Sequence, residues 1–126
     1  VNPPSTHRQQ VSKSQLSIFR GSWIADYADA ENYLSLFYSG NHSPNGPNYT
    51  HFSNSEFDEL YEKSLRIPEL ANRIPLYEKM DSIVINQAAI IPLYYDNVLR
   101  FSHKSVKGLG SNTMNLLDLK RVKIIN

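Results

Sequence analysis

Hydrophobic and polar positions follow several different spacings along this chain, and each spacing predicts a different element. Residues 16–25, "LSIFRGSWIA", are rich in β-branched and aromatic side chains and are short enough for a strand. The next apolar residues recur with the i, i+3, i+4 spacing of a helix. They are Ala30, Tyr33, Leu34, Phe37 and Tyr38. Asp29 precedes them where an N-cap is expected, and Gly40 follows in the usual position of a left-handed C-terminal cap.

A second helix is predicted behind residues 41–55, which form a loop because they are rich in proline, glycine and asparagine. Ser53 precedes Glu56 by three residues, which is the spacing of a capping box at a helix start. The apolar face of this helix comprises Phe57, Leu60, Tyr61, Ser64 and Leu65.

A third helix carries a proline that decides where we expect it to begin. A proline inside a helix costs about 3 kcal/mol, whereas the first turn tolerates it because the amide there has no intrahelical partner. Pro75 lies in the first turn if Asn72 is the N-cap. The helix is therefore predicted to begin at Arg73 rather than at Glu69. Its inner face comprises Leu76, Tyr77, Met80, Ile83, Val84 and Gln87.

Residues 1–15 form a polar segment that begins without methionine. Pro3 and Pro4 are expected to prevent regular structure at its start, and residues 6–15 are compatible with a short polar helix. Such a start is unusual for a gene product, so we expect a cut end there and a single partial domain over residues 1–126. A missing signal peptide therefore says nothing about secretion.

Two strands are predicted towards the C-terminus. Residues 89–102 are rich in β-formers, and residues 116–125 alternate in a way that predicts a final strand with one buried face. Gly108 and Gly110 mark a turn between them. The resulting order, strand–helix–loop–helix–helix–strand–strand, indicates an α/β or α+β arrangement, and α/β is the fold class that we predict.

Composition excludes several classes of function. At 126 residues the chain is one domain at most, and 40% hydrophobic residues with 20% charged residues predict a folded core. The formal net charge is +1 and the charges are interleaved, which argues against a nucleic-acid groove. The chain has no cysteine, so disulfides, thiolate metal sites and cysteine nucleophiles are excluded. No apolar run approaches the roughly 18 residues of a membrane span.

The candidate chemistry is concentrated in residues 20–34, "RGSWIADYADAENYL", which hold the only tryptophan and two aspartates. Asp29 is explained by its capping position. Asp26 has two interpretations: a turn residue that bonds its own backbone, or an acceptor for a cationic ligand, since an ammonium suits a carboxylate. A hydrolase could instead use both aspartates as an acid–base pair, but no nucleophile elbow or phosphate loop accompanies them.

The four histidines do not have the spacing of a metal site. They lie far apart in sequence, and none is paired with a second ligand four residues away on a helix. They are His7, His42, His51 and His103. We therefore expect no metal and no other cofactor in this chain.

Four stretches occur in order over residues 16–125 and together carry a family resemblance. They are "RGSWIADYADAENYL", "NYTHFSNSEFDELYEKSL", "NRIPLYEKMDSIVINQAAIIPLYYDNVLRF" and "VKGL". In this order they resemble the C-terminal part of a family 5 extracellular solute-binding protein, the dipeptide- and oligopeptide-binding group that delivers ligand to an ABC importer.

The resemblance implies a longer, two-lobed protein with a type II periplasmic-binding fold, which binds extended peptides between its lobes and performs no covalent chemistry. It implies importer membrane subunits as partners, and a periplasmic or cell-surface location, either free or lipid-anchored. This chain would be the C-terminal segment of one lobe.

The resemblance also implies the ligand-binding residues. Peptide-binding members anchor the ligand's α-ammonium on an aspartate three residues after the tryptophan, and Asp26 has that position after Trp23. Arg20 resembles an arginine that some members place near the ligand's carboxylate, which a guanidinium suits bidentately. Trp23 either walls the cleft or fills the core. Three neighbours are expected to contact the ligand through their main chain: Ser22, Ile24 and Ala25.

Two further expectations accompany this interpretation. The same fold hosts several ligand classes, so an oligosaccharide or a nickel chelate remains an alternative to a peptide. Without the rest of the lobe, residues 1–126 alone are expected to bind ligand weakly or not at all. They are also expected to self-associate through exposed strand edges and apolar faces.

Overall fold

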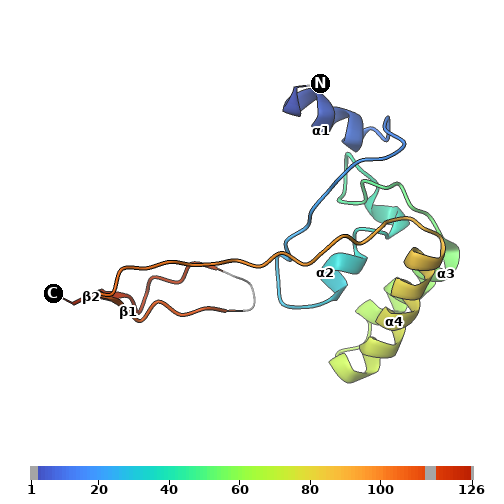
Figure 1. Ribbon diagram of the computed structural model, residues 1–126. Coiled ribbons are helices and arrows are strands. Elements are labelled where there is room, and N and C mark those ends of the chain that lie inside the picture. Colours follow the sequence, from blue (N-terminus) through green and yellow to red (C-terminus); the bar gives the residue numbers. More distant parts are fainter. Residues whose placement is uncertain (1–2, 113–115, 126) are drawn as a thin grey trace.

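The computed structural model describes residues 3–112 and 116–125, so the first two residues of the predicted N-terminal segment lie outside it. Its elements are α1 (Pro4–Ser12), α2 (Glu31–Leu34), the 3₁₀ helix η1 (Ser39–Asn41), α3 (Ser55–Leu65), α4 (Leu70–Asn86), β1 (Val106–Lys107) and β2 (Lys123–Ile124). Figure 1 shows α2, α3 and α4 close together, and the two strands at the far end of a long arm. The described chain is thus mostly helical or irregular, which corrects the predicted α/β order of elements.

The hydrophobic core lies among α2, α3, α4 and the loop before α3. Its buried members are Leu34, Phe37, Phe52, Phe57, Tyr61, Tyr77, Met80 and Val84. The Phe37 ring meets the rings of Phe52 and Phe57 edge-on, with centroids 6.1 and 6.4 Å away, an arrangement that aromatic quadrupoles favour. Most residues of the two predicted apolar faces are therefore inside, although Leu65 and Gln87 are exposed.

Helix α3 begins one residue later than the capping-box spacing predicts. The N-cap is Asn54, whose side-chain Oδ1 accepts a hydrogen bond from the Phe57 amide at 2.9 Å. Asn54 has the extended backbone of an N-cap, and asparagine is among the residues that cap best. The predicted box of Ser53 and Glu56 is therefore wrong, because the residue beside Ser53 does the capping.

Helix α4 begins at Leu70 with Glu69 as N-cap, so the predicted start at Arg73 is wrong and Pro75 lies inside the helix. The proline removes one intrahelical hydrogen bond. Packing compensates for that loss, because α4 lies against both α3 and α2. Arg73, in the first turn of α4, forms an ion pair with Asp29.

Helix α2 has only four residues, whereas the spacing predicts a helix that continues to Tyr38. Gly40 lies in η1, and no positive φ is recorded there, so the predicted left-handed cap is wrong. A Cβ on Gly40 would stand 2.5 Å from the Tyr38 ring. Close approach of that ring explains the glycine.

Helix α1 begins at Pro4, against the expectation that the two prolines prevent regular structure there. A proline suits the first helical position because its fixed φ is helical and an amide there would have no intrahelical partner. The helix ends at Ser12 and buries no residue, so it matches the short polar helix predicted over 6–15 only in part.

Residues 16–25 and 90–102 run as long traces without regular structure in Figure 1, and neither is a strand. A strand exists only where a neighbouring strand shares its backbone hydrogen bonds. In the described part of the chain, neither segment has such a neighbour. The two predicted strands are therefore wrong for this chain.

The ladder between β1 and β2 is antiparallel and very short. It pairs Val106 with Ile124 and Lys107 with Lys123. Both residues of β2 are exposed, so the strand predicted over 116–125 is shorter than expected and has no buried face. Gly108 follows β1 with φ +77°, a conformation that favours glycine, but the turn in this region lies at residues 104–105, before β1, so the turn predicted at Gly108 and Gly110 is wrong.

Candidate functional site

The six residues predicted to bind ligand lie on one exposed stretch that leads to α2 (Figure 1). Trp23 and Ala25 are partly buried. The other four are exposed: Arg20, Ser22, Ile24 and Asp26. The Ile24 side chain is 80% exposed, which is unusual for a large apolar residue.

Asn32 connects this stretch to α2. Its side-chain Oδ1 accepts hydrogen bonds from the Trp23 indole Nε1 at 2.7 Å and from the Asp26 amide at 3.2 Å. Asn32 is only 3% exposed, so these bonds are shielded from water. Asn32 is not among the residues predicted from the sequence. The signal that points to it is a poor helix former inside the predicted helix, where a side-chain hydrogen bond is the usual explanation.

The Asp26 carboxylate is not part of this anchor, because Asn32 bonds only the Asp26 amide. Asp26 is exposed, and among the described residues its carboxylate accepts no hydrogen bond and forms no ion pair. Its backbone is fixed by Asn32, whereas its side chain is open to a ligand.

Asp29 is held by three donors. Its Oδ1 accepts from the Glu31 amide at 3.0 Å and from the Tyr77 hydroxyl at 3.1 Å. Its Oδ2 pairs with Arg73 Nη1 at 2.7 Å. Burial would raise the pKa of Asp29, but these hydrogen bonds and the charge of Arg73 outweigh burial and hold that pKa below its usual value.

Asp29 is predicted to be the N-cap of α2, and it does bond a helix amide, but the N-cap is the next residue. The N-cap of α2 is Ala30, yet the Asp29 carboxylate does bond an amide of the first turn. Because the same carboxylate is bound to Arg73 and Tyr77, it is not free to act as the second acid of a hydrolase.

Glu31 is a buried carboxylate that is not among the residues predicted from the sequence. It is 8% exposed and accepts hydrogen bonds from the hydroxyls of Tyr27 and Tyr61. Burial, followed by the bond to Glu31, raises the pKa of Tyr61 far above its usual value. The bond to Glu31, followed by burial, also raises the pKa of Tyr27. The bond from Tyr61 fastens α2 to α3, and the bond from Tyr27 joins α2 to the residues that precede it.

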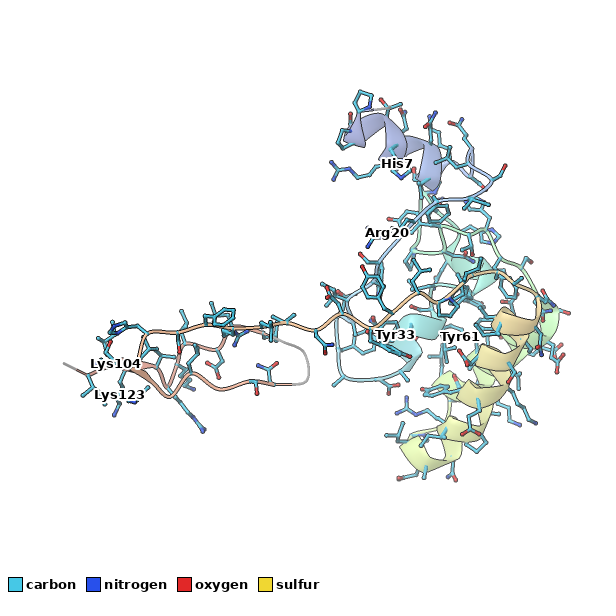
Figure 2. All side chains as sticks on the ribbon, in the orientation of Figure 1. His7, Arg20, Tyr33, Tyr61, Lys104 and Lys123 are labelled. Carbon is cyan, nitrogen blue, oxygen red and sulfur yellow. The ribbon has the colours of Figure 1, made fainter. Side chains whose placement is uncertain are left out.

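Arg20 donates a hydrogen bond from Nη2 to the Tyr94 hydroxyl at 2.6 Å. This contact joins the two long irregular segments, although 74 positions separate the residues. In Figure 2, Arg20 lies on the segment that descends towards the helical part, far from Lys104 and Lys123 at the end of the arm. The remaining donors of the guanidinium can still meet a ligand carboxylate.

Two of the four histidines, His42 and His51, contact each other, but without the geometry of a metal site. The rings of His42 and His51 stack with centroids 5.0 Å apart, and His42 Nε2 lies 3.0 Å from the Phe52 carbonyl. Within the described residues, no three potential metal ligands come together. In the same part of the chain, no helix combines the length and apolarity needed to cross a membrane.

Two shallow hollows of about 350 and 490 Å³ lie along α3 and α4. Neither of them is lined by a residue of the stretch 20–26. They are therefore not the ligand cleft that the resemblance implies.

Comparison with known proteins gives no match to a family model. The chain is 31% identical over 112 residues to the dipeptide-binding protein DppE of Bacillus subtilis, covering 89% of this chain and 20% of that protein. It is 28% identical over 78 residues to the periplasmic oligopeptide-binding protein OppA of Escherichia coli, covering 62% and 14%. It is 31% identical over 87 residues to heme-binding protein A of Haemophilus influenzae, covering 69% and 16%.

The chain spans no more than about a fifth of the length of these relatives. Each of the three is named for what it binds, and two of the three are named for binding peptides. The chain is a distant homologue of the dipeptide- and oligopeptide-binding proteins of solute-binding protein family 5.

Proposed function

We propose that this chain is the C-terminal part of one lobe of a two-lobed solute-binding protein, and that Asp26 binds the α-ammonium of an extended peptide. The observation that carries the proposal is the exposed Asp26 carboxylate, which has no partner among the described residues while its amide is fixed by Asn32. An ammonium offers three donors and one positive charge, and a carboxylate accepts both. When two lobes close over such a pair, the lower dielectric strengthens it.

The backbone before Asp26 supports the capture of a peptide in extended form. In the described part of the chain, residues 16–25 make no backbone–backbone hydrogen bond. Their amides and carbonyls are therefore free to bond a peptide main chain or a neighbouring strand, which is how extended peptides are held without dependence on their sequence. In this arrangement Ser22, Ile24 and Ala25 act through their main chain, Trp23 walls the cleft, and Arg20 lies near the peptide carboxylate.

The relatives' names support a binding protein over an enzyme. The full protein would pass its peptide to the membrane subunits of an ABC importer, from the periplasm or from the cell surface. The exposed apolar residues of the irregular segment 90–102 would be covered by the rest of the lobe. Ile91, Leu93, Tyr95, Leu99 and Phe101 are each more than two thirds exposed.

Titration calorimetry on the full-length protein that carries this chain tests the role of Asp26. The variant Asp26→Ala should bind a peptide with a free amino terminus at least about tenfold more weakly, a change of roughly 1.4 kcal/mol. Asp81→Ala, which removes an exposed carboxylate from α4, is the matched control and should keep the wild-type affinity. Equal affinity of Asp26→Ala and wild type would refute the proposal.

A second candidate is the same fold with a different ligand, and the 31% identity to a heme-binding protein favours keeping it. Thermal-shift measurements with peptides, oligosaccharides, nickel chelates and heme separate the two. A ligand at 100 times its dissociation constant stabilises its protein by roughly 2.7 kcal/mol. A shift with heme or a nickel chelate but with no peptide would favour the second candidate.

A further inference from the structure

Asn32 has a buried polar side chain, and among the described residues the hydrogen bonds of that side chain go to the stretch before α2. Its Oδ1 accepts from Trp23 Nε1 at 2.7 Å and from the Asp26 amide at 3.2 Å. A carbonyl oxygen has two lone pairs, so these two donors satisfy it. The Asn32 backbone amide also donates to the Asp29 carbonyl at 3.1 Å. One residue therefore holds both ends of the loop from Trp23 to Asp29.

The loop has little else to hold its shape at the Asp26 end. Among the described residues, the bond from the Asp26 amide to Asn32 is the only hydrogen bond made by the backbone of residues 23–26. Since Asn32 is 3% exposed, water cannot readily replace that bond. The position of the Asp26 backbone thus depends on Asn32.

We propose that Asn32 is a positioning residue for the ligand's amino terminus: it fixes the Asp26 backbone and the Trp23 indole together, so that the carboxylate is held ready for an ammonium. The inference rests on the proposed function. A carboxylate on a fixed backbone loses less freedom on binding than one on a mobile loop, so pre-organisation appears as affinity. Asn32 acts through Asp26 and does not touch the ligand.

The test measures preference for a free amino terminus, which a merely structural residue does not change. In the full-length protein, calorimetry compares one peptide with its N-acetylated form, and wild type should prefer the free form at least about tenfold. Asn32→Ala should lose most of this preference. Asn32→Asp, which keeps an acceptor oxygen at the same place, should retain more of it than Asn32→Ala.

Asn48→Ala is the matched control, because Asn48 is also buried and its side chain bonds the carbonyls of Tyr38 and Phe52 in a different loop. It should lower stability but keep the preference for a free amino terminus. If Asn32→Ala keeps the preference while Asp26→Ala loses it, Asn32 has no positioning role and the proposed function stands. If Asp26→Ala also keeps it, the proposed function fails, and this inference fails with it.

A measurement on the unaltered chain guards against variants that do not fold. Hydrogen exchange of residues 1–126, followed by NMR, should show the Asp26 amide and the indole N–H of Trp23 exchanging at least about tenfold more slowly than the Ser22 amide, since a shielded hydrogen bond slows exchange. Ser22 has no hydrogen bond in the described structure. Exchange of the Asp26 amide as fast as that of Ser22 would overturn the proposal.

Discussion

The hydrogen bond from Tyr61 to the buried carboxylate of Glu31 holds α2 against α3, and its removal has a predictable cost. Tyr61→Phe deletes only the hydroxyl and leaves the ring, which stacks on Tyr38 with centroids 4.8 Å apart. Tyr61 is 5% exposed and Glu31 is 8% exposed, so water does not replace the lost donor. A hydrogen bond to an ionised group contributes about 1.5–3 kcal/mol. Because Tyr27 still donates to Glu31, we expect the free energy of unfolding to fall by about 2 kcal/mol.

Urea denaturation of the chain at pH 7, followed by far-UV circular dichroism, measures this loss. Tyr49→Phe is the matched control, because Tyr49 is 41% exposed and its hydroxyl makes no hydrogen bond among the described residues. It should change the free energy of unfolding by no more than about 0.5 kcal/mol. Unfolding of both variants at the same urea concentration would refute this role of the Tyr61 hydroxyl.

The raised pKa of Tyr61 also predicts how the free energy of unfolding changes at alkaline pH. Burial and the bond to Glu31 raise the pKa of Tyr61 above its ordinary value of 10.0, so the folded chain holds the phenolic proton more tightly than the unfolded chain. This contribution is complete below about pH 10 and is lost as the pH rises further, by up to about 1.4 kcal/mol per pH unit. Tyr61→Phe should therefore reduce the slope of stability against pH between about pH 10 and 11. A slope equal to that of wild type would contradict the assignment.

Three further outcomes follow from the structure. The pKa of Asp29 is lowered from its ordinary value of 3.8, so its bonds stabilise the folded chain at pH values above 3.8. This contribution to stability is lost as the pH falls below 3.8 and through the lowered pKa. Acid denaturation of Asp29→Asn should accordingly depend less on pH than that of wild type, and an identical dependence would exclude this role. Asn54→Ala should cost about 1 kcal/mol in urea denaturation because it removes the cap of α3, whereas Ser53→Ala should cost little; the reverse order would support the capping box instead. Residues 1–126 alone should show no micromolar peptide affinity by calorimetry and should self-associate in sedimentation velocity, so a monomer with micromolar affinity would contradict both expectations.

The parts of the fold that follow from sequence are those set by local spacing. The inner face of α3 is predicted correctly at Phe57, Tyr61 and Ser64, because helical periodicity is a property of adjacent turns. The start of α4 is not predicted correctly, because the helix contains Pro75 and its packing against α3 and α2 is not visible in the local spacing. The strands are not predictable for a similar reason, because an extended segment becomes a strand only when a partner lies beside it.

The candidate site, too, follows from the sequence only in part. The exposed position of Asp26 agrees with the stretch that the sequence singles out, although its role stays a prediction. Spacing along the sequence does not identify the buried residues that hold α2 in place. Glu31 is recognised as a buried acceptor only once Tyr61, 30 positions away, is seen to donate to it.

The contact between Arg20 and Tyr94 has a consequence for the order of events during folding. All of α2, α3 and α4 lie within the 74 positions that it spans, and contacts within and between neighbouring helices close much shorter loops. The helices should therefore assemble first and carry the two long segments to a common place, where the guanidinium meets the phenol at low entropic cost. A binding edge made from these segments would then be the last part of the chain to become ordered, and the first to be lost when the helices loosen.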